Sequence, residues 1–391
     1  MSEVRVNNLS NENNTGGPTI SGITTYSGRH FFVPPSGTTA ERPEDCEPGS
    51  LRFNTDSTKL EYFKGNTIGW VEIEASSPEL GGGTSSSNEN ALGARGIAGG
   101  GFLGTRTIEF VTISTFGDSQ DFGDLTAAGA IHGKQAVSTE TRMLFSGGYI
   151  INAIEFITVA STGDAIDFGD LTIRLYGATG VNDTIRGIFC GGASTTPFVP
   201  SHGGVTNVIQ YVTIATEADA VDFGDLLLTG FPGGSMNNTT RGIIARQNGP
   251  VGPNAIMDTI TMRTLGNATD FGDCLSGTGS NVAGGVCNAT RGILAGGYST
   301  GFINIIQYIT MATLGDATDF GDLLVTQNNL RAASSKTRGI FTGGHNGSNN
   351  TNSIESVQIS TTGNSVDFGD MAYISGNVGQ VTFNSNAHGG I

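Results

Sequence analysis

The stretch TRGILAGGYSTGFINIIQYITMATLGDATDFGDLL, from Thr290 to Leu324, contains every part of a pattern that the chain repeats. It opens with Arg-Gly and an apolar run, continues through Gly-Gly and a second apolar run, and ends in Asp-Phe-Gly-Asp. This ending occurs six times, at spacings of 46, 55, 48, 49 and 48 residues, which chance does not produce. The copies begin at Asp121, Asp167, Asp222, Asp270, Asp319 and Asp367. We therefore expect a repeat architecture.

One arginine opens the apolar run of each copy and is usually followed by glycine. These arginines are Arg95, Arg142, Arg186, Arg241, Arg291 and Arg338. The run usually ends in Gly-Gly, although Arg246-Gln247 replaces the pair in the fourth copy. The second run, such as IEFITVAST, alternates apolar and polar residues as a strand with one buried face does. With Asp-Phe-Gly-Asp as a third strand and weaker segments such as RAASS (331–335) as a fourth, each repeat has three or four short strands.

The number and size of the repeats predict the fold. Residues 94–391 are 298 residues, or about 50 for each of six repeats, which suits a propeller blade. Closing six four-stranded blades around an axis leaves only short edges, whereas a parallel β-solenoid, the alternative, usually has much shorter coils. The C-terminal GQVTFNSNAHGGI (379–391) mimics the segment that leads into each Arg-Gly. We therefore expect its strand to complete the first blade of a six-bladed β-propeller.

The repeat also carries a resemblance. Gly-Gly after an apolar strand, a variable loop and an Ile-x-x-Tyr-like strand together resemble kelch repeats. The fuller pattern, TRGIFxGG followed by IxYxTIxTxGDAxDFGDL, is similar to a kelch-like repeat of structural proteins from marine tailed bacteriophages, notably those of cyanobacteria. The resemblance covers residues 94–391. It implies a virion protein with an all-β, six-bladed kelch-like propeller, made in the host cytoplasm.

Residues 1–80 form a different, β-rich module, joined to the repeats by a flexible linker over residues 81–93. The segment PGSLRFNTDSTKLEYFKGNTIGWVEIEA (48–75) predicts a three-stranded meander with Phe53, Tyr62 and Trp70 as its small core. It resembles a short module of phage fibre and neck proteins. The resemblance implies attachment to other virion proteins through residues 1–80. Because three strands make a poor independent core, we also expect a homo-oligomer, with a trimer as one arrangement.

Composition excludes several classes of protein. The net charge is 19 − 35 = −16, so we expect no binding of nucleic acid. The opening residues lack the apolar core of a signal peptide, and no apolar run reaches the length of a membrane span. The four cysteines have no zinc spacing and are expected to be buried thiols, although Cys274 and Cys287 could also meet as a disulfide.

The motifs do not indicate an enzyme, a cofactor or a catalytic site. Asp-Phe-Gly also occurs in kinases, but six copies without a phosphate loop or a His-Arg-Asp string exclude that class. Four copies read Asp-x-x-Asp-x-x-Asp, whose oxygens could bind calcium. We favour instead that the carboxylates cap turns and pair with the one arginine of each repeat. The five histidines show no metal spacing, so no metal site is predicted.

The longest loop of the repeats offers a candidate contact surface. ASTTPFVPSHGGVTN (193–207) carries Pro197, Phe198, Pro200 and His202, although a self-packed loop explains the same residues. The expected function is a virion structural protein of the fibre or appendage type, whose propeller displays a surface to a host glycan or protein. The alternatives are a passive neck or capsid decoration protein and a carbohydrate-binding propeller.

Overall fold

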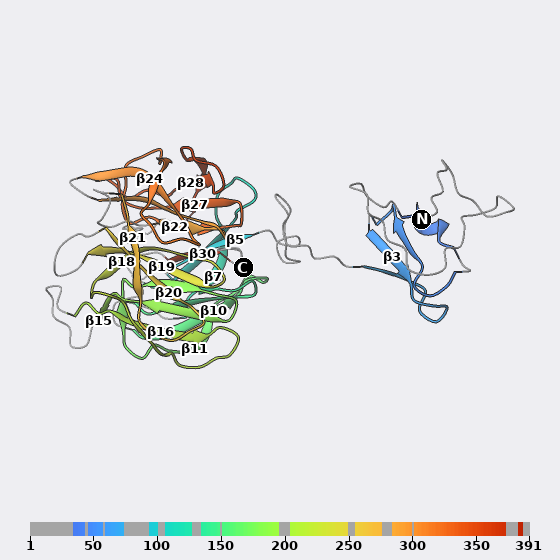
Figure 1. The fold of residues 1–391 in the computed structure, drawn as a ribbon, viewed down its shortest axis with the longest axis horizontal. Coiled ribbons are helices and arrows are strands. Elements are labelled where there is room, and N and C mark those ends of the chain that lie inside the picture. Colours follow the sequence, from blue (N-terminus) through green and yellow to red (C-terminus); the bar gives the residue numbers. More distant parts are fainter. Residues whose placement is uncertain are drawn as a thin grey trace, which may run out of the picture. The chain divides into compact units, whose positions relative to one another are not determined.

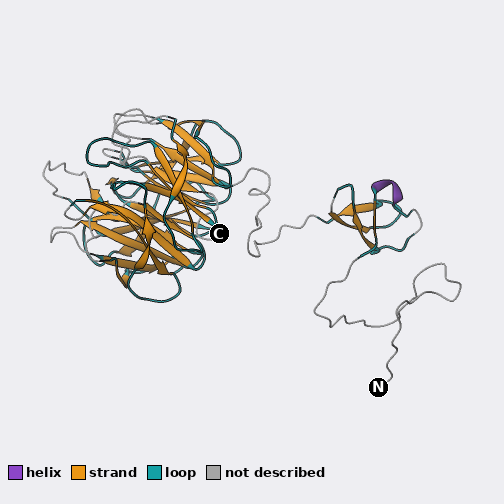
Figure 2. Ribbon diagram, turned by 90° about the horizontal axis from the view of Figure 1, so that it is seen from above, coloured by secondary structure: helices purple, strands orange, loops and turns teal. Residues whose placement is uncertain are grey.

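A computed structural model describes residues 34–43, 46–57, 59–73, 94–100, 106–126, 134–148, 151–194, 204–248, 255–275, 284–298, 301–372 and 382–385, the side chains of 246–248 and 382–385 excepted. The chain divides into two compact units, residues 1–76 and 77–391. Strands dominate both, which confirms the predicted all-β class (Figures 1 and 2). In the described part of the chain, no helix is long and apolar enough to cross a membrane.

The N-terminal unit contains the predicted meander. Strands β2 (Leu51–Asn54), β3 (Lys59–Phe63) and β4 (Trp70–Glu72) pair antiparallel, and β1 (Ser36–Gly37) adds a short parallel edge beside the 3-10 turn η1 (Thr39–Glu41). The predicted core is wrong. Strand alternation places Phe53 and Tyr62 on the same face, whereas Trp70 lies on the other, where it packs on the buried Phe63 with ring centroids 5.5 Å apart.

The described part of the second unit contains six four-stranded antiparallel sheets. Each sheet begins with a short strand, continues through the Arg-Gly strand and the second apolar strand, and ends in Asp-Phe-Gly-Asp. In this order the strands of the first sheet are β30 (Thr382–Ser385), β5 (Arg95–Gly99), β6 (Thr107–Thr112) and β7 (Gln120–Asp124), and those of the second are β8 (Gln135–Ser138), β9 (Arg142–Ser146), β10 (Ala153–Thr158) and β11 (Ile166–Asp170). The third sheet consists of β13 (Thr179–Asn182), β14 (Arg186–Cys190), β16 (Val208–Thr213) and β17 (Val221–Asp225), and the fourth of β18 (Phe231–Asn237), β19 (Arg241–Asn248), β20 (Ile256–Thr261) and β21 (Thr269–Asp273). The fifth consists of β22 (Gly284–Cys287), β23 (Arg291–Tyr298), β24 (Phe302–Thr310) and β25 (Thr318–Asp322), and the sixth of β26 (Arg331–Ser334), β27 (Arg338–Thr342), β28 (Ser353–Gln358) and β29 (Val366–Asp370).

Two predictions about these sheets are confirmed. The weak segment RAASS forms β26, so the repeat has four strands. The segment near the C-terminus forms β30, which pairs antiparallel with β5 from Thr382 opposite Gly99 to Ser385 opposite Gly96. The first sheet therefore joins the two ends of the repeat region.

The hydrophobic core lies between sheets. Buried apolar residues form six clusters, and each cluster joins residues of two sheets that follow one another, with the sixth sheet packed against the first. The first strands of the sheets contact each other in the same cyclic order. Apolar residues of all four strands contribute to these clusters, because each sheet is flanked by a neighbour on either side. A two-stranded sheet, β12 (Leu175–Tyr176) with β15 (Ala193–Ser194), lies outside this pattern.

Candidate functional site

The repeated arginine fastens each sheet to the next. Its Nη1 atom donates a hydrogen bond to a backbone carbonyl just after the third strand of the following repeat. The acceptors, in repeat order, are the carbonyl oxygens of Val159 (2.7 Å), Ile214 (3.3 Å), Met262 (3.0 Å), Met311 (2.9 Å), Ile359 (3.0 Å) and Ile113 (2.9 Å). The last bond runs from Arg338 in the sixth repeat to the first. All six repeats are therefore linked in a cycle by one residue type.

The same guanidinium groups lie over aromatic rings, between 4.5 and 5.8 Å from the nearest ring centroid. Arg291, for example, lies over Tyr308 of its own sheet at 4.5 Å. The predicted pairing of these arginines with the repeated aspartates is wrong. A half-buried guanidinium is held here by a carbonyl and a π face, whereas the aspartates of Asp-Phe-Gly-Asp lie on the fourth strand of the sheet.

The Asp-Phe-Gly-Asp strand forms the outer edge of each sheet, and the next repeat covers it. The phenylalanine is buried between the sheets, while the first aspartate points to solvent. The glycine has no room for a side chain: a Cβ on Gly321 would lie 2.5 Å from the carbonyl oxygen of Gly363, and φ is +153°. The motif is therefore explained by close backbone approach at the edge of the sheet.

The residue three positions before each Asp-Phe-Gly-Asp completes the same junction. Its side-chain Oδ1 accepts the backbone N–H of the last aspartate in the preceding repeat, at 2.9 to 3.1 Å. The six acceptors are Asp118, Asp164, Asp219, Asn267, Asp316 and Asn364. Since asparagine serves in two copies, the position requires an oxygen acceptor and not a charge. Within the described residues no group of three or more His, Cys, Asp or Glu could hold a metal ion, so the calcium alternative finds no support there.

A further set of buried polar residues was missed by the sequence analysis. Each third strand carries one buried side chain with a hydrogen-bond acceptor. In five junctions this side chain accepts a backbone N–H from the preceding repeat, namely that of the second residue after Asp-Phe-Gly-Asp. The sixth, Glu155, accepts the hydroxyl of Thr126 at 2.5 Å. The set consists of Glu109, Glu155, Gln210, Asp258, Gln307 and Glu355. The sequence feature that identifies these residues is a polar residue at the same position in each mainly apolar third strand.

Small polar side chains link the first strands to one another. Asn182 bonds the backbone N–H and carbonyl of Ser138, and Ser334 does the same for Cys287 at 3.3 and 3.0 Å. Between these two links, the Cys287 thiol accepts the backbone N–H of Asn237 and donates to the Asn237 carbonyl. All four cysteines are free, so Cys274 and Cys287 do not form a disulfide. Cys190, Cys274 and Cys287 are buried as expected, whereas Cys46 is partly exposed.

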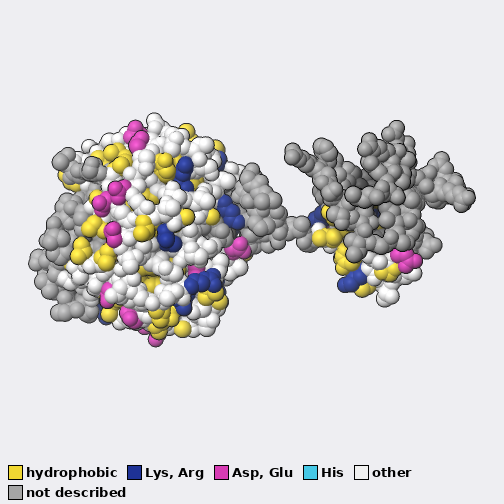
Figure 3. Space-filling model, in the orientation of Figure 1, with side chains coloured by type: hydrophobic (Ala, Val, Ile, Leu, Met, Phe, Trp, Pro, Cys, Tyr) yellow, Lys and Arg dark blue, Asp and Glu magenta, His cyan; other side chains and the backbone are white. Residues whose placement is uncertain are grey.

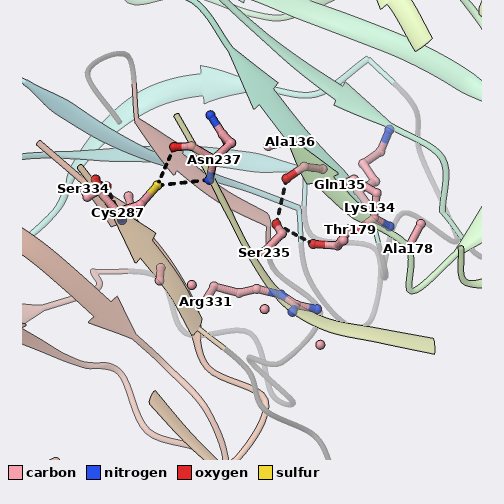
Figure 4. A pocket seen from close by; sticks show the side chains of 16 residues that line it. Lys134, Gln135, Ala136, Ala178, Thr179, Ser235, Asn237, Cys287, Arg331 and Ser334 are labelled. Carbon is pink, nitrogen blue, oxygen red and sulfur yellow. Dashed lines mark hydrogen bonds between the residues drawn. The ribbon is translucent and has the colours of Figure 1, made fainter. Parts of the chain in front are cut away.

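A polar cavity of about 70 Å³ lies among these first strands. Its described walls come from β8, β13, β18, β22 and β26 (Figure 4). Gln135, Thr179 and Ser235 line it, and Thr179 donates to Ser235 at 2.9 Å, which donates to the Gly180 carbonyl at 2.8 Å. Two cationic residues, Lys134 and Arg331, also contribute to the wall.

The two cations have different surroundings. Lys134 is fully buried, with Nζ 3.6 Å from Glu155 Oε2, and burial lowers its pKa against the opposing effect of that carboxylate. Arg331 is partly exposed, yet protein surrounds it closely enough that burial lowers its pKa to about 10. Arg331 therefore stays charged at neutral pH.

The predicted contact residues Pro197, Phe198, Pro200 and His202 lie outside the described residues. The backbone on either side of them is described: Ser194 donates to the Gly204 carbonyl at 2.7 Å, and β15 pairs with β12, which carries Tyr176. The described residues on the two sides of this segment are therefore paired with each other. No family model and no curated protein matches this chain.

Proposed function

We propose that the repeat unit is a six-bladed kelch-like β-propeller and that the protein is a structural component of a tailed-bacteriophage virion, of the fibre or appendage type. The observation that carries the proposal is the cyclic use of the repeated polar residues. The arginine, the Asn or Asp acceptor and the buried acceptor of the third strand each recur six times, and each links a sheet to its neighbour. Residues that recur in every sheet have a role in assembly, whereas a catalytic group is needed once.

The surface fits a displayed scaffold. On the face seen in Figure 3, acidic and basic side chains are scattered among uncharged ones. Exposed apolar residues stand on the turns and outer strands, among them Phe116, Leu265 and Leu314. A surface of low charge density favours contact with a glycan or protein over contact with a phosphate backbone.

The N-terminal unit supplies the attachment. One face of its sheet is mostly apolar, formed by Leu51, Phe53, Leu60, Tyr62, Val71 and Ile73, with Ser36 of β1 opposite Phe53 at the edge. Leu51, Leu60 and Ile73 are 38 to 43% exposed, and Phe63 is the buried hydrophobic side chain among the described residues of the unit. An apolar face of this kind is expected to dock, either on other copies of the chain or on a neighbouring virion protein.

Two experiments test this proposal. Residues 91–391 expressed alone should be monomeric by analytical ultracentrifugation and should not bind particles that lack the protein, whereas the full chain should bind them. In the full chain, Leu60→Asp should abolish attachment. Ile68→Asp is the matched control, because Ile68 is 59% exposed on the turn between β3 and β4, outside the strands that form the apolar face. A repeat unit that still assembles on the particle, or equal loss in both variants, contradicts the assignment.

A further inference from the structure

The cavity among the first strands has the opposite charge to the chain. The sequence contains 35 acidic and 19 basic residues, yet Lys134 and Arg331 line the cavity and the described lining includes no Asp or Glu. The ammonium group of Lys134 faces Glu155. Arg331 is therefore the residue that gives the cavity its positive character.

Arg331 also departs from the repeat. Arg331 lies opposite Thr342, which is four residues after the repeated arginine of its sheet. In four other sheets, the first-strand residue at the same position is Gln135, Thr179, Gly284 or Thr382. Those sheets reach the same centre without a charge, so packing alone does not require one. Surrounding a guanidinium with protein costs free energy, and a charge placed at such a cost is a mark of a functional site.

The geometry suits an anion. In Figure 4 the side chain of Arg331 extends from β26 across the cavity towards the side where Thr179 lies. A guanidinium is a planar fork of N–H donors that matches the two oxygens of a carboxylate or a phosphate. The hydroxyls of Thr179 and Ser235, held by their own hydrogen bonds, supply further polar wall.

The cavity is large enough for a small ligand. About 70 Å³ holds several waters, which is room for one small oxyanion. A free ion or the terminal group of a larger molecule therefore fits.

We propose that this cavity is a binding site for a small oxyanion, carboxylate or phosphate, held by Arg331. The site does not depend on the virion role, so it is tested on the purified full chain. Isothermal titration with sodium phosphate, and separately with sodium acetate, should show saturable binding of at least one, while sodium chloride at equal ionic strength should show none. Comparison of the two titrations identifies whether phosphate or carboxylate is preferred.

Variants locate the binding. Arg331→Gln should weaken it at least tenfold, and Arg106→Gln, at an exposed arginine outside the cavity, should leave it unchanged. Gln135→Glu is nearly isosteric and keeps Arg331, so it tests the site even if Arg331→Gln does not fold; the added carboxylate should also weaken binding at least tenfold. Absence of binding to the wild type overturns the proposal, as does unchanged binding in Gln135→Glu or in a folded Arg331→Gln.

Discussion

The two units of this chain differ in where their polar and apolar side chains are buried. In the repeat unit, apolar residues lie between sheets and the buried polar side chains bond the backbone of the neighbouring repeat. In the N-terminal unit, the more buried face holds the carboxylate of Glu61 with Arg42 and Arg52, and the apolar face is partly exposed. A repeat array supplies its own partners, because every sheet has a neighbour on each side, whereas a single small sheet has none.

This difference indicates where each unit obtains its stability. The repeat unit contains six similar junctions and closes on itself through β30. In the N-terminal unit an ion-pair cluster lies on the more buried face, and the apolar face is partly exposed. Changes at a junction should therefore affect the whole repeat unit, whereas changes in the meander should affect the N-terminal unit and the attachment that we propose for it.

The largest effect is expected from removing residues 378–391. The truncation deletes β30, leaves the edge of β5 unpaired and removes the strand that contacts both β8 and β26. We expect the repeat unit to lose about 3–5 kcal/mol or more, which lowers its melting temperature by roughly 10 °C. Circular dichroism of the full chain measures the change in melting temperature. A melting curve identical to that of the wild type would show that the cycle does not need this strand.

A second large effect is expected at the glycine of Asp-Phe-Gly-Asp. Gly321→Ala places a Cβ 2.5 Å from the Gly363 carbonyl oxygen, whereas Gly315→Ala has the same backbone strain, with φ of +155° against +153°, and nothing within 4 Å. The difference between the two variants isolates the close approach of neighbouring repeats. We expect Gly321→Ala to be less stable by about 2 kcal/mol or more in urea unfolding. Equal stability of the two variants would mean that the junction adapts and that φ alone requires glycine.

The sequence predicted the all-β class, the strand content and the return of the C-terminal segment because these follow from period and spacing. The partners of the repeated residues were harder to predict. An arginine and an aspartate in each copy suggested an ion pair, but the arginine bonds a carbonyl about 70 residues ahead. Recurrence shows that a residue matters to a repeat, whereas its partner depends on how neighbouring sheets pack.

The cavity cannot be predicted from any one stretch of the sequence. RAASS predicts Arg331 only as part of a weak strand, because nothing local distinguishes it from the other charged residues of the chain. Five described strands from distant parts of the sequence line the cavity that contains it. In the N-terminal unit, the aromatic residues suggested a core, but alternation along β2 and β3 assigns Phe53 and Tyr62 to the partly exposed face.

A moderate effect is expected from Arg291→Ala. The variant loses the 3.0 Å bond to the Ile359 carbonyl and the contact with Tyr308, which together should cost about 1.5–3 kcal/mol. Arg106→Ala, at an exposed arginine, is the matched control and should change stability by less than about 0.5 kcal/mol. Urea unfolding followed by circular dichroism compares them. If both variants unfold with the wild type, the repeated arginine does not fasten the sheets.

The smallest effect is expected from acid on the N-terminal unit. Hydrogen bonds from Arg42, at 3.0 and 2.5 Å to Glu61 Oε2, hold the pKa of that carboxyl below its ordinary value of 4.5, and Asn54 and Arg52 act in the same direction. Between the lowered pKa and 4.5 the unfolded chain binds more protons than the folded chain. The stabilisation is therefore present in full above about pH 4.5 and is lost as the pH falls through the folded-state value.

Trp70 makes this effect measurable in the full chain, because it is the only tryptophan and belongs to the N-terminal unit, where it donates to the Pro43 carbonyl at 3.2 Å. The urea midpoint of its fluorescence should fall as the pH is lowered from 5 towards 3, while the circular dichroism transition of the repeat unit moves less. Glu61→Gln should lower the midpoint at neutral pH and flatten its dependence on acid, and Glu47→Gln, at an exposed position, should change neither. The variant isolates the contribution of Glu61 from those of Glu41 and Glu72, whose pKa values are lowered by hydrogen bonds of their own. If Glu61→Gln keeps the full acid dependence of the wild type, the ion-pair cluster does not stabilise this unit.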